Sequence, residues 1–380
     1  MRLFHISDLH IGKNLHGYNL REDQEYILNE IVNQINEKQP QVLMITGDIY
    51  DKSVPSAEAV LVFDNFLSTI SKKFQDMLIL IIAGNHDSAE RIDYAKTILA
   101  HQNIYICGMP PRSEDEHIMK VEGVDEFGPI DFYLLPFVKP SMVNKLFLEG
   151  GLSYNECVSR LISRENIDFS KRNVILAHQF FVPSNGKVET SDSEAIVVGG
   201  IDNVYADCIK EFDYCALGHI HKPQRIGENI LYAGSPLKYS SSEANQIKSI
   251  NMIDILKKGD VRVSHIELQP LRNLIVLKGK LSDIIANFNE KDRQSYVSIT
   301  VTDEDKLYKP KETLEAYYEN IIEFKIDNSQ IRKEIYDYDE EIKLEDPIKA
   351  FGDFYENANG ITMTDDEKEI MIKVFNEVKL

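Results

Sequence analysis

The chain has 380 residues and a net charge of −20, with 43% hydrophobic and 27% charged residues. This composition is ordinary for a globular protein and excludes a disordered one, and at roughly 150 residues per domain the length predicts two or three domains. The acidic balance argues against a nucleic-acid-binding protein, because such proteins usually carry a basic surface.

The cysteine pattern and the N-terminus indicate the compartment. The four cysteines show neither CxxC spacing nor the framework of a secreted protein, which is typical of a reduced, cytoplasmic protein. Arg2 is followed at once by a strand-like segment, unlike a signal peptide, and no apolar run approaches the roughly 20 residues of a membrane helix. We therefore expect a soluble protein in the cytoplasm.

Over the first two hundred residues, short apolar segments alternate with helical patterns. The apolar segments predict buried strands at 3–6, 42–45, 78–83, 132–135 and 174–177. Helical spacing of apolar residues marks 22–37 and 57–71. This alternation predicts an α/β sheet with helices on its faces. From about residue 213 the pattern is more β-like, and it ends in a hairpin that turns at Gly259-Asp260.

The character of the sequence changes after Pro270. Residues 271–340 alternate strand and helix patterns and predict a small α+β domain, while the acidic stretch 337–345 is a plausible linker. Helix-start signals at Asp346-Pro347 and in the capping box 364–367 predict a helical hairpin. So small a unit cannot bury the apolar stripes of both helices. These stripes must therefore dock either on the body of the protein or on another chain, and we favour another chain. The expected domains are 1–270, 271–340 and 341–380.

Five polar motifs follow predicted strands, where open α/β sheets build their sites. They are Asp8-Leu9-His10, Gly47-Asp48-Ile49-Tyr50-Asp51, Gly84-Asn85-His86-Asp87, His178 and Gly218-His219-Ile220-His221. Each motif alone is weak, since a single DxH is usually a turn and a glycine before a histidine often only marks a loop. Five in fixed order, each at a strand end, are not explained by accident.

The residue types in these motifs suit metal ions. Carboxylates, imidazoles and an amide oxygen without thiolates favour Mn²⁺, Fe²⁺ or Zn²⁺. With one bridging carboxylate, the set would hold two ions roughly 3.5–4 Å apart, the spacing that clamps the attacking and leaving oxygens of a phosphoryl transfer. A water between the two ions would supply the nucleophile, so no Ser-His or Cys-His pair is needed.

The motif order resembles the calcineurin-like metallophosphoesterase family. Within it, residues 216–223 and 232–237, together with Glu243 and Lys248, are most similar to the SbcD branch of nuclease subunits. The resemblance covers about residues 1–270 by specific motifs and the remainder by architecture. It implies an αββα sandwich, a small α+β cap domain that grips DNA, and a C-terminal helical hairpin that docks on the SbcC ATPase.

The resemblance also assigns roles to the motif residues. Asp8, His10, Asp48 and His221 would bind one metal, and Asp48 would bridge to a second that is completed by Asn85, His178 and His219. His86 would stabilise the transition state or protonate the leaving oxygen. We expect Asp51 to pair with His86, setting its tautomer and raising its pKa, with a plain helix-start carboxylate as the alternative.

The implied function is that of a DNA nuclease using two divalent ions, with Mn²⁺ expected. The family's activities are double-strand 3′–5′ exonuclease and single-strand or hairpin endonuclease, in DNA repair, recombination and replication-intermediate processing. The family forms a heterotetramer with two SbcC ATPases and dimerises through the nuclease domain, with 57–66 or 88–99 as possible surfaces. The chain lacks a G-x-x-x-x-G-K-[ST] loop, so ATP dependence would reside in the partner. The alternatives are a small-molecule or phosphoprotein phosphoesterase and a non-catalytic scaffold, although every ligand position is filled.

Basic side chains in loops near the motifs are candidates for DNA phosphates. They are Lys13, His16, Arg21, Lys52, Arg91 and Lys222. Each is equally consistent with a surface salt bridge. Metal ions would neutralise the ligand carboxylates, and the acidic linker and tail need not face DNA. We therefore expect this chain alone to bind DNA weakly and in a salt-sensitive manner.

Overall fold

The computed structural model describes residues 1–143, 146–147, 151–194, 200–305, 307–328, 351–352, 355–356 and 362–378. The chain divides into two compact units. The first holds residues 1–277, 289–298 and 315–323, and the second holds 278–288, 299–314 and 324–380. None of the helices in the described ranges is both long and apolar enough to cross a bilayer.

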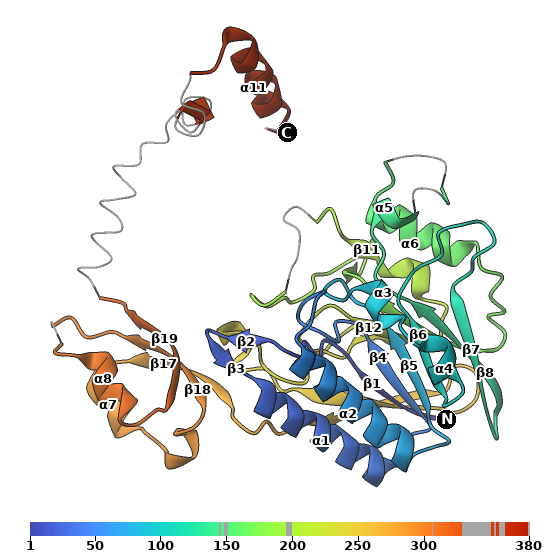
Figure 1. Cartoon of the computed structure of the whole chain (residues 1–380), viewed down its shortest axis with the longest axis horizontal. Helices are drawn as coiled ribbons and strands as arrows, with labels where there is room; N and C mark the ends of the chain where they lie inside the picture. Colours follow the sequence, from blue (N-terminus) through green and yellow to red (C-terminus); the bar gives the residue numbers. More distant parts are fainter. Residues whose placement is uncertain are drawn as a thin grey trace. The chain divides into compact units, whose positions relative to one another are not determined.

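The first unit contains two six-stranded sheets (Figure 1). One has the order β16-β15-β1-β4-β5-β6, in which β1, β4, β5 and β6 are parallel while β15 and β16 are antiparallel to their neighbours. Its strands are β1 (Arg2–Ile6), β4 (Val42–Thr46), β5 (Leu78–Ile82), β6 (Ile104–Cys107), β15 (Ser249–Ile255) and β16 (Val261–Glu267). Parallel strands that are covered on both faces consist almost entirely of apolar residues, because neither face meets water. β4 and β5 have this composition.

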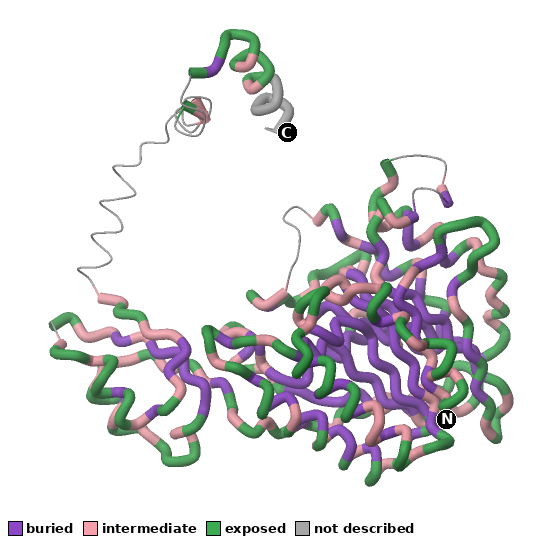
Figure 2. Tube along the Cα trace, viewed as in Figure 1, coloured by how far each residue is buried: buried purple, intermediate pink, exposed green. Residues whose placement is uncertain are grey.

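The second sheet has the order β13-β14-β12-β9-β8-β7. Its strands are β7 (Met119–Asp125), β8 (Gly128–Leu135), β9 (Arg172–His178), β12 (Tyr214–Gly218), β13 (Gln224–Gly227) and β14 (Ile230–Tyr232). A shared apolar core joins the sheets, with Leu3, Met44 and Leu80 of one sheet in the same buried cluster as Phe132 and Leu176 of the other. Figure 2 shows this buried centre in purple.

Helices cover the outer faces of the sandwich. On the first sheet, α1 (Arg21–Lys38) and α2 (Ala57–Lys73) bury apolar stripes in one cluster with β1, β4 and β5. On the second, α6 (Tyr154–Ser163) packs with the 3₁₀ helix η1 (Ala206–Ile209). Side-chain caps start two of these helices, Ser56 for α2 and the Ser153–Glu156 capping box for α6. The αββα sandwich expected from the sequence is confirmed.

Shorter elements connect these layers. They are β2 (Asn14–Leu15), β3 (Tyr18–Asn19), α3 (Ala89–Ile92), α4 (Lys96–Ala100), α5 (Pro140–Val143), β10 (Phe181–Val182), β11 (Val204–Tyr205) and η2 (Ser241–Glu243). The predicted hairpin at Gly259-Asp260 is present between β15 and β16.

A three-stranded sheet in the order β17-β18-β19 follows the sandwich. Its elements are β17 (Leu274–Gly279), α7 (Leu281–Ala286), η3 (Glu290–Asp292), β18 (Tyr296–Val301), α8 (Pro310–Glu315) and β19 (Asn320–Ile326), as the strand–helix pattern predicts. The last helix, α11 (Asp365–Val378), begins at the predicted capping box, where the Glu367 N–H donates to Thr364 Oγ1 at 3.4 Å. The predicted linker 337–345 and most of the first tail helix lie outside the described residues.

Candidate metal centre

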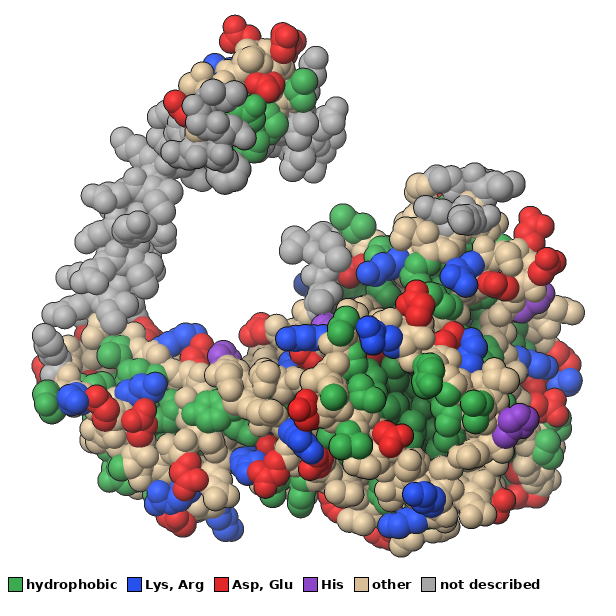
Figure 3. Space-filling model, viewed as in Figure 1, with side chains coloured by type: hydrophobic (Ala, Val, Ile, Leu, Met, Phe, Trp, Pro, Cys, Tyr) green, Lys and Arg blue, Asp and Glu red, His purple; other side chains and the backbone are tan. Residues whose placement is uncertain are grey.

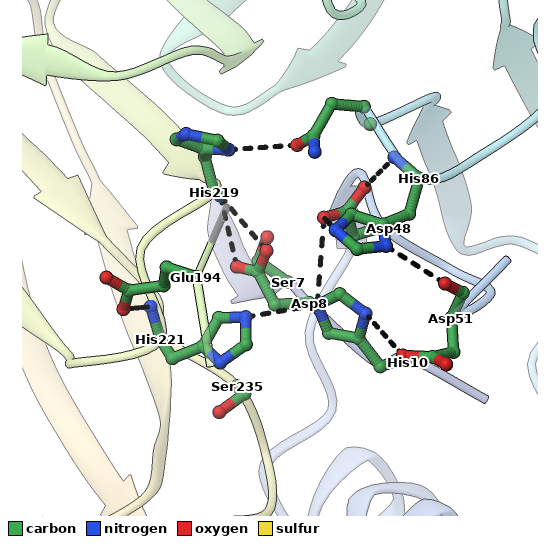
Figure 4. Close-up of polar contacts among 12 residues, drawn as sticks. Ser7, Asp8, His10, Asp48, Asp51, His86, Glu194, His219, His221 and Ser235 are labelled. Carbon is green, nitrogen blue, oxygen red and sulfur yellow. Dashed lines mark hydrogen bonds and ion pairs between the residues drawn. The ribbon is translucent and has the colours of Figure 1, made fainter. Parts of the chain in front are cut away.

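The predicted ligands converge at one edge of the sandwich. Each lies at or just after the carboxyl end of a strand: Asp8 and His10 after β1, Asp48 after β4, Asn85 after β5, His178 at the end of β9, and His219 and His221 after β12. Because β1, β4 and β5 are parallel, and β9 and β12 are parallel, these ends meet (Figure 4). The two sheets thus supply opposite halves of one site.

Unusual backbone conformations concentrate at these residues. Asp8, His10, Asp48 and His219 have φ values of 52°, 43°, 48° and 97°. Residues other than glycine pay on the order of 1–3 kcal/mol for such strain, which persists where the surroundings impose it. Here backbone bonds do so: the His10 N–H donates to the Asp48 carbonyl at 2.9 Å, and the Asp8 N–H to the Gly47 carbonyl at 3.1 Å. The loops after β1 and β4 therefore form one rigid unit.

Two motif glycines provide the room that the site needs. Gly47 has a φ of +90°, and a Cβ there would overlap the His178 ring. A Cβ on Gly84 would overlap the Asp48 carboxylate. These glycines are explained by close packing of the loop backbone against ligand side chains.

The first predicted ligand cluster is compact. The Nε2 atoms of His10 and His221 are 3.0 Å apart, and the ligand atoms of Asp8, His10 and His221 all lie within 4.8 Å of one another. The Asp48 carboxylate approaches His10 Nε2 to 3.6 Å. Two buried imidazole nitrogens this close, beside two carboxylates, match the donor set of a divalent transition-metal ion.

The second cluster shares Asp48. Its Oδ2 lies 3.4 Å from His178 Nε2, while Asn85 Oδ1 lies 3.1 Å from His178 Nε2 and 2.9 Å from His219 Nδ1. The Thr46 carbonyl, 2.7 Å from His178 Nδ1, accepts a hydrogen bond from that nitrogen, so that Nε2 faces Asp48. Asp48 is thus placed between the two clusters, where a bridging ligand would lie.

The site is buried, and its charges interact strongly. Burial raises the pKa of Asp8, and burial together with His178 lowers that of His219 to about 3. For His178, burial alone would lower the pKa, but Asp48 and Asp8 outweigh it and raise the value to about 9. Asp48 therefore favours the protonated form of His178, and a bound cation would compete with that proton.

His86 and Asp51 are paired differently from the sequence prediction. The acceptor 2.9 Å from His86 Nδ1 is the backbone carbonyl of Asp51, and not its carboxylate. That carboxylate lies 2.8 Å from Lys13 Nζ and 3.6 Å from His10 Nδ1. Asp51 therefore contacts His86, as predicted, but through its backbone carbonyl, because the loop turns the Asp51 side chain toward Lys13 and His10. The carbonyl still directs His86 Nε2 toward the metal cluster, at 4.0 Å from Asp48 Oδ2.

Asp87 has a structural role that the motif alone did not reveal. Its carboxylate accepts backbone N–H groups from Ile49 at 3.2 Å, Tyr50 at 3.0 Å and Gly84 at 2.9 Å. Burial and Asp48 raise its pKa to about 6. Asp87 therefore ties the loops after β4 and β5 together, and its place in the Gly-Asn-His-Asp motif was the available signal.

Four further residues support His221, and sequence reasoning gave them no role. Ser193 Oγ lies 2.7 Å from His221 Nδ1 and donates to Glu243 Oε1 at 2.5 Å. Glu243 in turn accepts from Lys248 Nζ at 2.5 Å, and Glu194 accepts the His221 N–H at 2.7 Å. His221 Nε2 is thereby held toward His10. The subfamily match of Glu243 and Lys248 was the only sequence signal.

The six predicted DNA-contacting residues do not form one cluster. Lys13 is beside the site, against Asp51 and 5.6 Å from the centre of the Tyr239 ring. Lys222 pairs with Glu189, and Arg21 pairs with Glu25 at 2.8 Å. Arg21 and Lys52 line a cavity of about 590 Å³ that also reaches Asp51. His16 and Arg91 are exposed.

Two family comparisons agree with this geometry. Residues 1–223 match the family described as Calcineurin-like phosphoesterase, and residues 270–359 match one described as Type 5 capsule protein repressor C-terminal domain. The chain therefore belongs to the calcineurin-like phosphoesterase family, whose enzymes are metal-dependent hydrolases of phosphate esters. With two ligand clusters in place, its class is that of a dimetal phosphodiesterase.

Curated relatives narrow the family to one branch. The chain is 31% identical over 370 residues to the D subunit of the SbcCD nuclease of Staphylococcus epidermidis, covering 94% of this chain and 93% of that protein. It is 27% identical over 379 residues to the protein of the same name from Staphylococcus saprophyticus, covering 98% and 97%. This branch, the SbcD proteins of SbcCD nucleases, is the one to which the chain belongs. The structure was also compared with that of a dimetal phosphatase from Danio rerio. The alignment covers 70% of this chain and 96% of the phosphatase, with 12% sequence identity and a TM-score of 0.38.

Proposed function

We propose that this chain is the nuclease subunit of an SbcCD-type complex and hydrolyses DNA phosphodiesters with two divalent ions, Mn²⁺ serving best. The observation that carries the proposal is the Asp48 carboxylate, 3.6 Å from His10 Nε2 and 3.4 Å from His178 Nε2, between two clusters of buried ligands. Imidazole with carboxylate donors suits Mn²⁺ better than Mg²⁺, which prefers an all-oxygen shell. By the branch it belongs to, the proposed work is DNA repair, recombination and processing of replication intermediates, in the cytoplasm at the nucleoid.

Residues of this chain would hold and orient the reacting groups. Asp8, His10, Asp48 and His221 would hold one ion, and Asp48, Asn85, His178 and His219 the other. When bound, the ions supply neutralisation of the phosphate charge and activation of the attacking water. His86 is one quarter exposed, whereas His10, His178 and His221 are almost fully buried. Its Nε2 is therefore placed to donate a proton or hydrogen bond to an oxygen of a phosphodiester docked over the ligands.

The first test compares substrates and metals. With Mn²⁺, we expect the purified chain to cut single-stranded and hairpin DNA endonucleolytically. Exonuclease cleavage of duplex DNA from 3′ ends should require the ATPase partner and ATP. Mg²⁺ should support at least tenfold lower rates, because the histidine-rich donor set suits it poorly. The measurement is kcat/KM on end-labelled DNA beside that on bis(p-nitrophenyl) phosphate. Hydrolysis of small phosphodiesters with no DNA cleavage under any of these conditions would favour a small-molecule phosphoesterase.

Two surfaces support the proposed assembly of two nuclease and two ATPase subunits. Exposed apolar side chains lie on α2 (Val60 and Leu61), between α3 and α4 (Tyr94) and on α4 (Ile98). In Figure 3, hydrophobic side chains gather where these helices lie. An exposed apolar patch is typical of an interface, so we assign this patch to a homodimer through the nuclease domain. In the tail, Ile370 on α11 is 60% exposed, as a helix that docks on another chain would leave it.

Deleting residues 341–380 should separate assembly from catalysis. We expect the truncated chain to lose co-purification with the SbcC partner, because its docking helices are gone, while Mn²⁺-dependent cleavage of single-stranded DNA stays within about twofold. Light scattering should still report a homodimer, because Val60 and Leu61 remain. A matched control replaces Lys368 and Glu369 on the polar side of α11 by alanine and should keep the partner. Full complex formation by the truncated chain would place the docking surface elsewhere.

A further inference from the structure

A small cavity lies directly beside the second ligand cluster. Its volume is about 220 Å³, below the roughly 300–1,000 Å³ of sites for drug-sized ligands. Two metal-ligand candidates, Asn85 and His219, form part of its wall. A group seated in this cavity would therefore adjoin whatever phosphate the metal centre holds.

The remaining wall is rich in aromatic rings. Phe137, Tyr154 and Phe180 line the cavity, and all three are only partly buried. The Phe137 ring is stacked on His219, with centroids 6.3 Å apart and planes 23° apart, and it lies 6.4 Å from the Tyr154 ring. Phe180 approaches His219 from another side, at 6.2 Å. Aromatic rings around a narrow cavity are suited to a flat, aromatic guest.

A buried polar group adds a second, independent feature. Gln179 is 1% exposed and lines the same cavity. Its Nε2 donates to the Val138 carbonyl at 2.8 Å, which fixes the orientation of the amide. Among the described residues, its Oε1 has no hydrogen-bond partner. That oxygen has almost no accessible surface, so Gln179 gives the cavity a fixed, buried wall and does not offer an open contact to a ligand.

At the cavity, Lys139 adds a positive charge and the buried Asp202 side chain adds a carboxylate. Its Nζ lies 5.8 Å from the centre of the Phe137 ring, and the side chain is exposed. An exposed ammonium beside an aromatic cavity suits a ligand that joins a flat ring to an anionic backbone. A nucleotide has this combination, whereas a simple phosphomonoester does not.

We propose that this cavity, lined by Phe137, Tyr154, Phe180 and Gln179, receives one unstacked nucleobase of the strand whose phosphodiester is cut. The inference rests on the proposed DNA-cleaving function. The aromatic rings stack on the base, and Lys139 pairs with a neighbouring phosphate.

The test combines a change in the substrate with a change in the cavity, as in a double-mutant cycle. Single-stranded oligonucleotides carry one abasic residue at successive positions around the cleavage site, and kcat/KM is measured for wild type and for a Phe137→Leu/Phe180→Leu variant. In wild type, one abasic position should lower kcat/KM roughly 5- to 150-fold, the range expected for one lost base stack. In the variant, the intact substrate should already be slow, and the abasic residue should cost less than twofold more.

Controls separate the possible failures. Phe127→Leu, at the opposite end of β8 from Phe137, should respond to the abasic residue as wild type does. Metal content and the circular dichroism spectrum of each variant check that the centre and the fold persist. If wild type cuts no DNA, the proposed function fails. If it cuts DNA but the abasic penalty is absent, or is equal in wild type and the double variant, the cavity assignment fails.

Discussion

Replacing His86 by glutamine is expected to lower kcat for DNA cleavage by about 10²- to 10⁴-fold, the usual contribution of a positioned proton donor. The ring is held by the Asp51 carbonyl at Nδ1, so that Nε2 lies at the metal cluster without being enclosed by it. Glutamine retains a donor but cannot transfer a proton. The measurement is single-turnover cleavage of single-stranded DNA with Mn²⁺.

Substrates with different leaving groups distinguish proton transfer by His86 from simple hydrogen bonding by His86. Cleavage of DNA expels a poor alkoxide leaving group, whereas bis(p-nitrophenyl) phosphate expels a stable phenolate. If His86 protonates the leaving oxygen, the loss on the chromogenic ester should be at least tenfold smaller. Equal losses on both substrates would instead assign His86 to stabilising charge on the phosphate.

Two variants serve as controls for this result. Asp48→Asn should lose metal as well as activity, as measured by calorimetric titration with Mn²⁺, because Asp48 borders both clusters. His117→Gln alters a 62% exposed histidine that pairs with Glu165, and should behave as wild type. His86→Gln with reduced metal content would show that His86 helps to hold the ions, which would contradict the role proposed here.

Replacing Lys248 by methionine should have the largest effect on stability, about 3–5 kcal/mol of the free energy of unfolding. Lys248 Nζ donates to Glu243 Oε2 at 2.5 Å and to the His221 carbonyl at 2.8 Å, and both side chains are almost fully buried. Burial alone would raise the pKa of Glu243, but His221 and Lys248 outweigh it and hold the pKa well below its usual value. Methionine would thus leave an ionised carboxylate buried without its cation.

The effect should extend to the metal centre through Ser193. Because Ser193 Oγ links Glu243 to His221 Nδ1, a displaced Glu243 should loosen His221 and weaken Mn²⁺ binding by about 10- to 100-fold, as for other partners of metal-bound histidines. Urea unfolding of the metal-free protein and calorimetric Mn²⁺ titration measure the two consequences separately.

A second substitution tests whether the buried charge causes the loss. The Glu243→Gln/Lys248→Met double variant removes both charges and should recover at least a third of the lost stability, since no unpaired carboxylate remains. Lys171→Met, in a pair in which both side chains are 53% exposed, should cost less than about 1 kcal/mol. A Lys248→Met protein as stable as Lys171→Met would rule out the buried ion pair as a stabilising feature.

The fold was largely readable from the sequence because its patterns are local. Continuous apolar runs such as 42–45 and 78–83 became buried parallel strands, since only strands covered on both faces tolerate such runs. Helical spacing at 22–37 and 57–71 became α1 and α2 to within about two residues at each end. The strands β17, β18 and β19 and the capping box before α11 were equally local signals.

By itself, the sequence determined the chemistry of the centre: carboxylate, imidazole and amide side chains in five short motifs, each after a strand. Strand ends converge by topology, so the motifs, together with the family resemblance, sufficed to predict seven candidate ligands that the fold brings together. Only the tertiary structure decided how these ligands are supported. Asp51 meets His86 through its carbonyl. Ser193 links His221 to Glu243, from which it is 50 positions away in the sequence. Phe137 and Phe180 line one cavity with Gln179. Such contacts join separate loops, whose relative positions depend on packing of the two sheets and not on any local pattern.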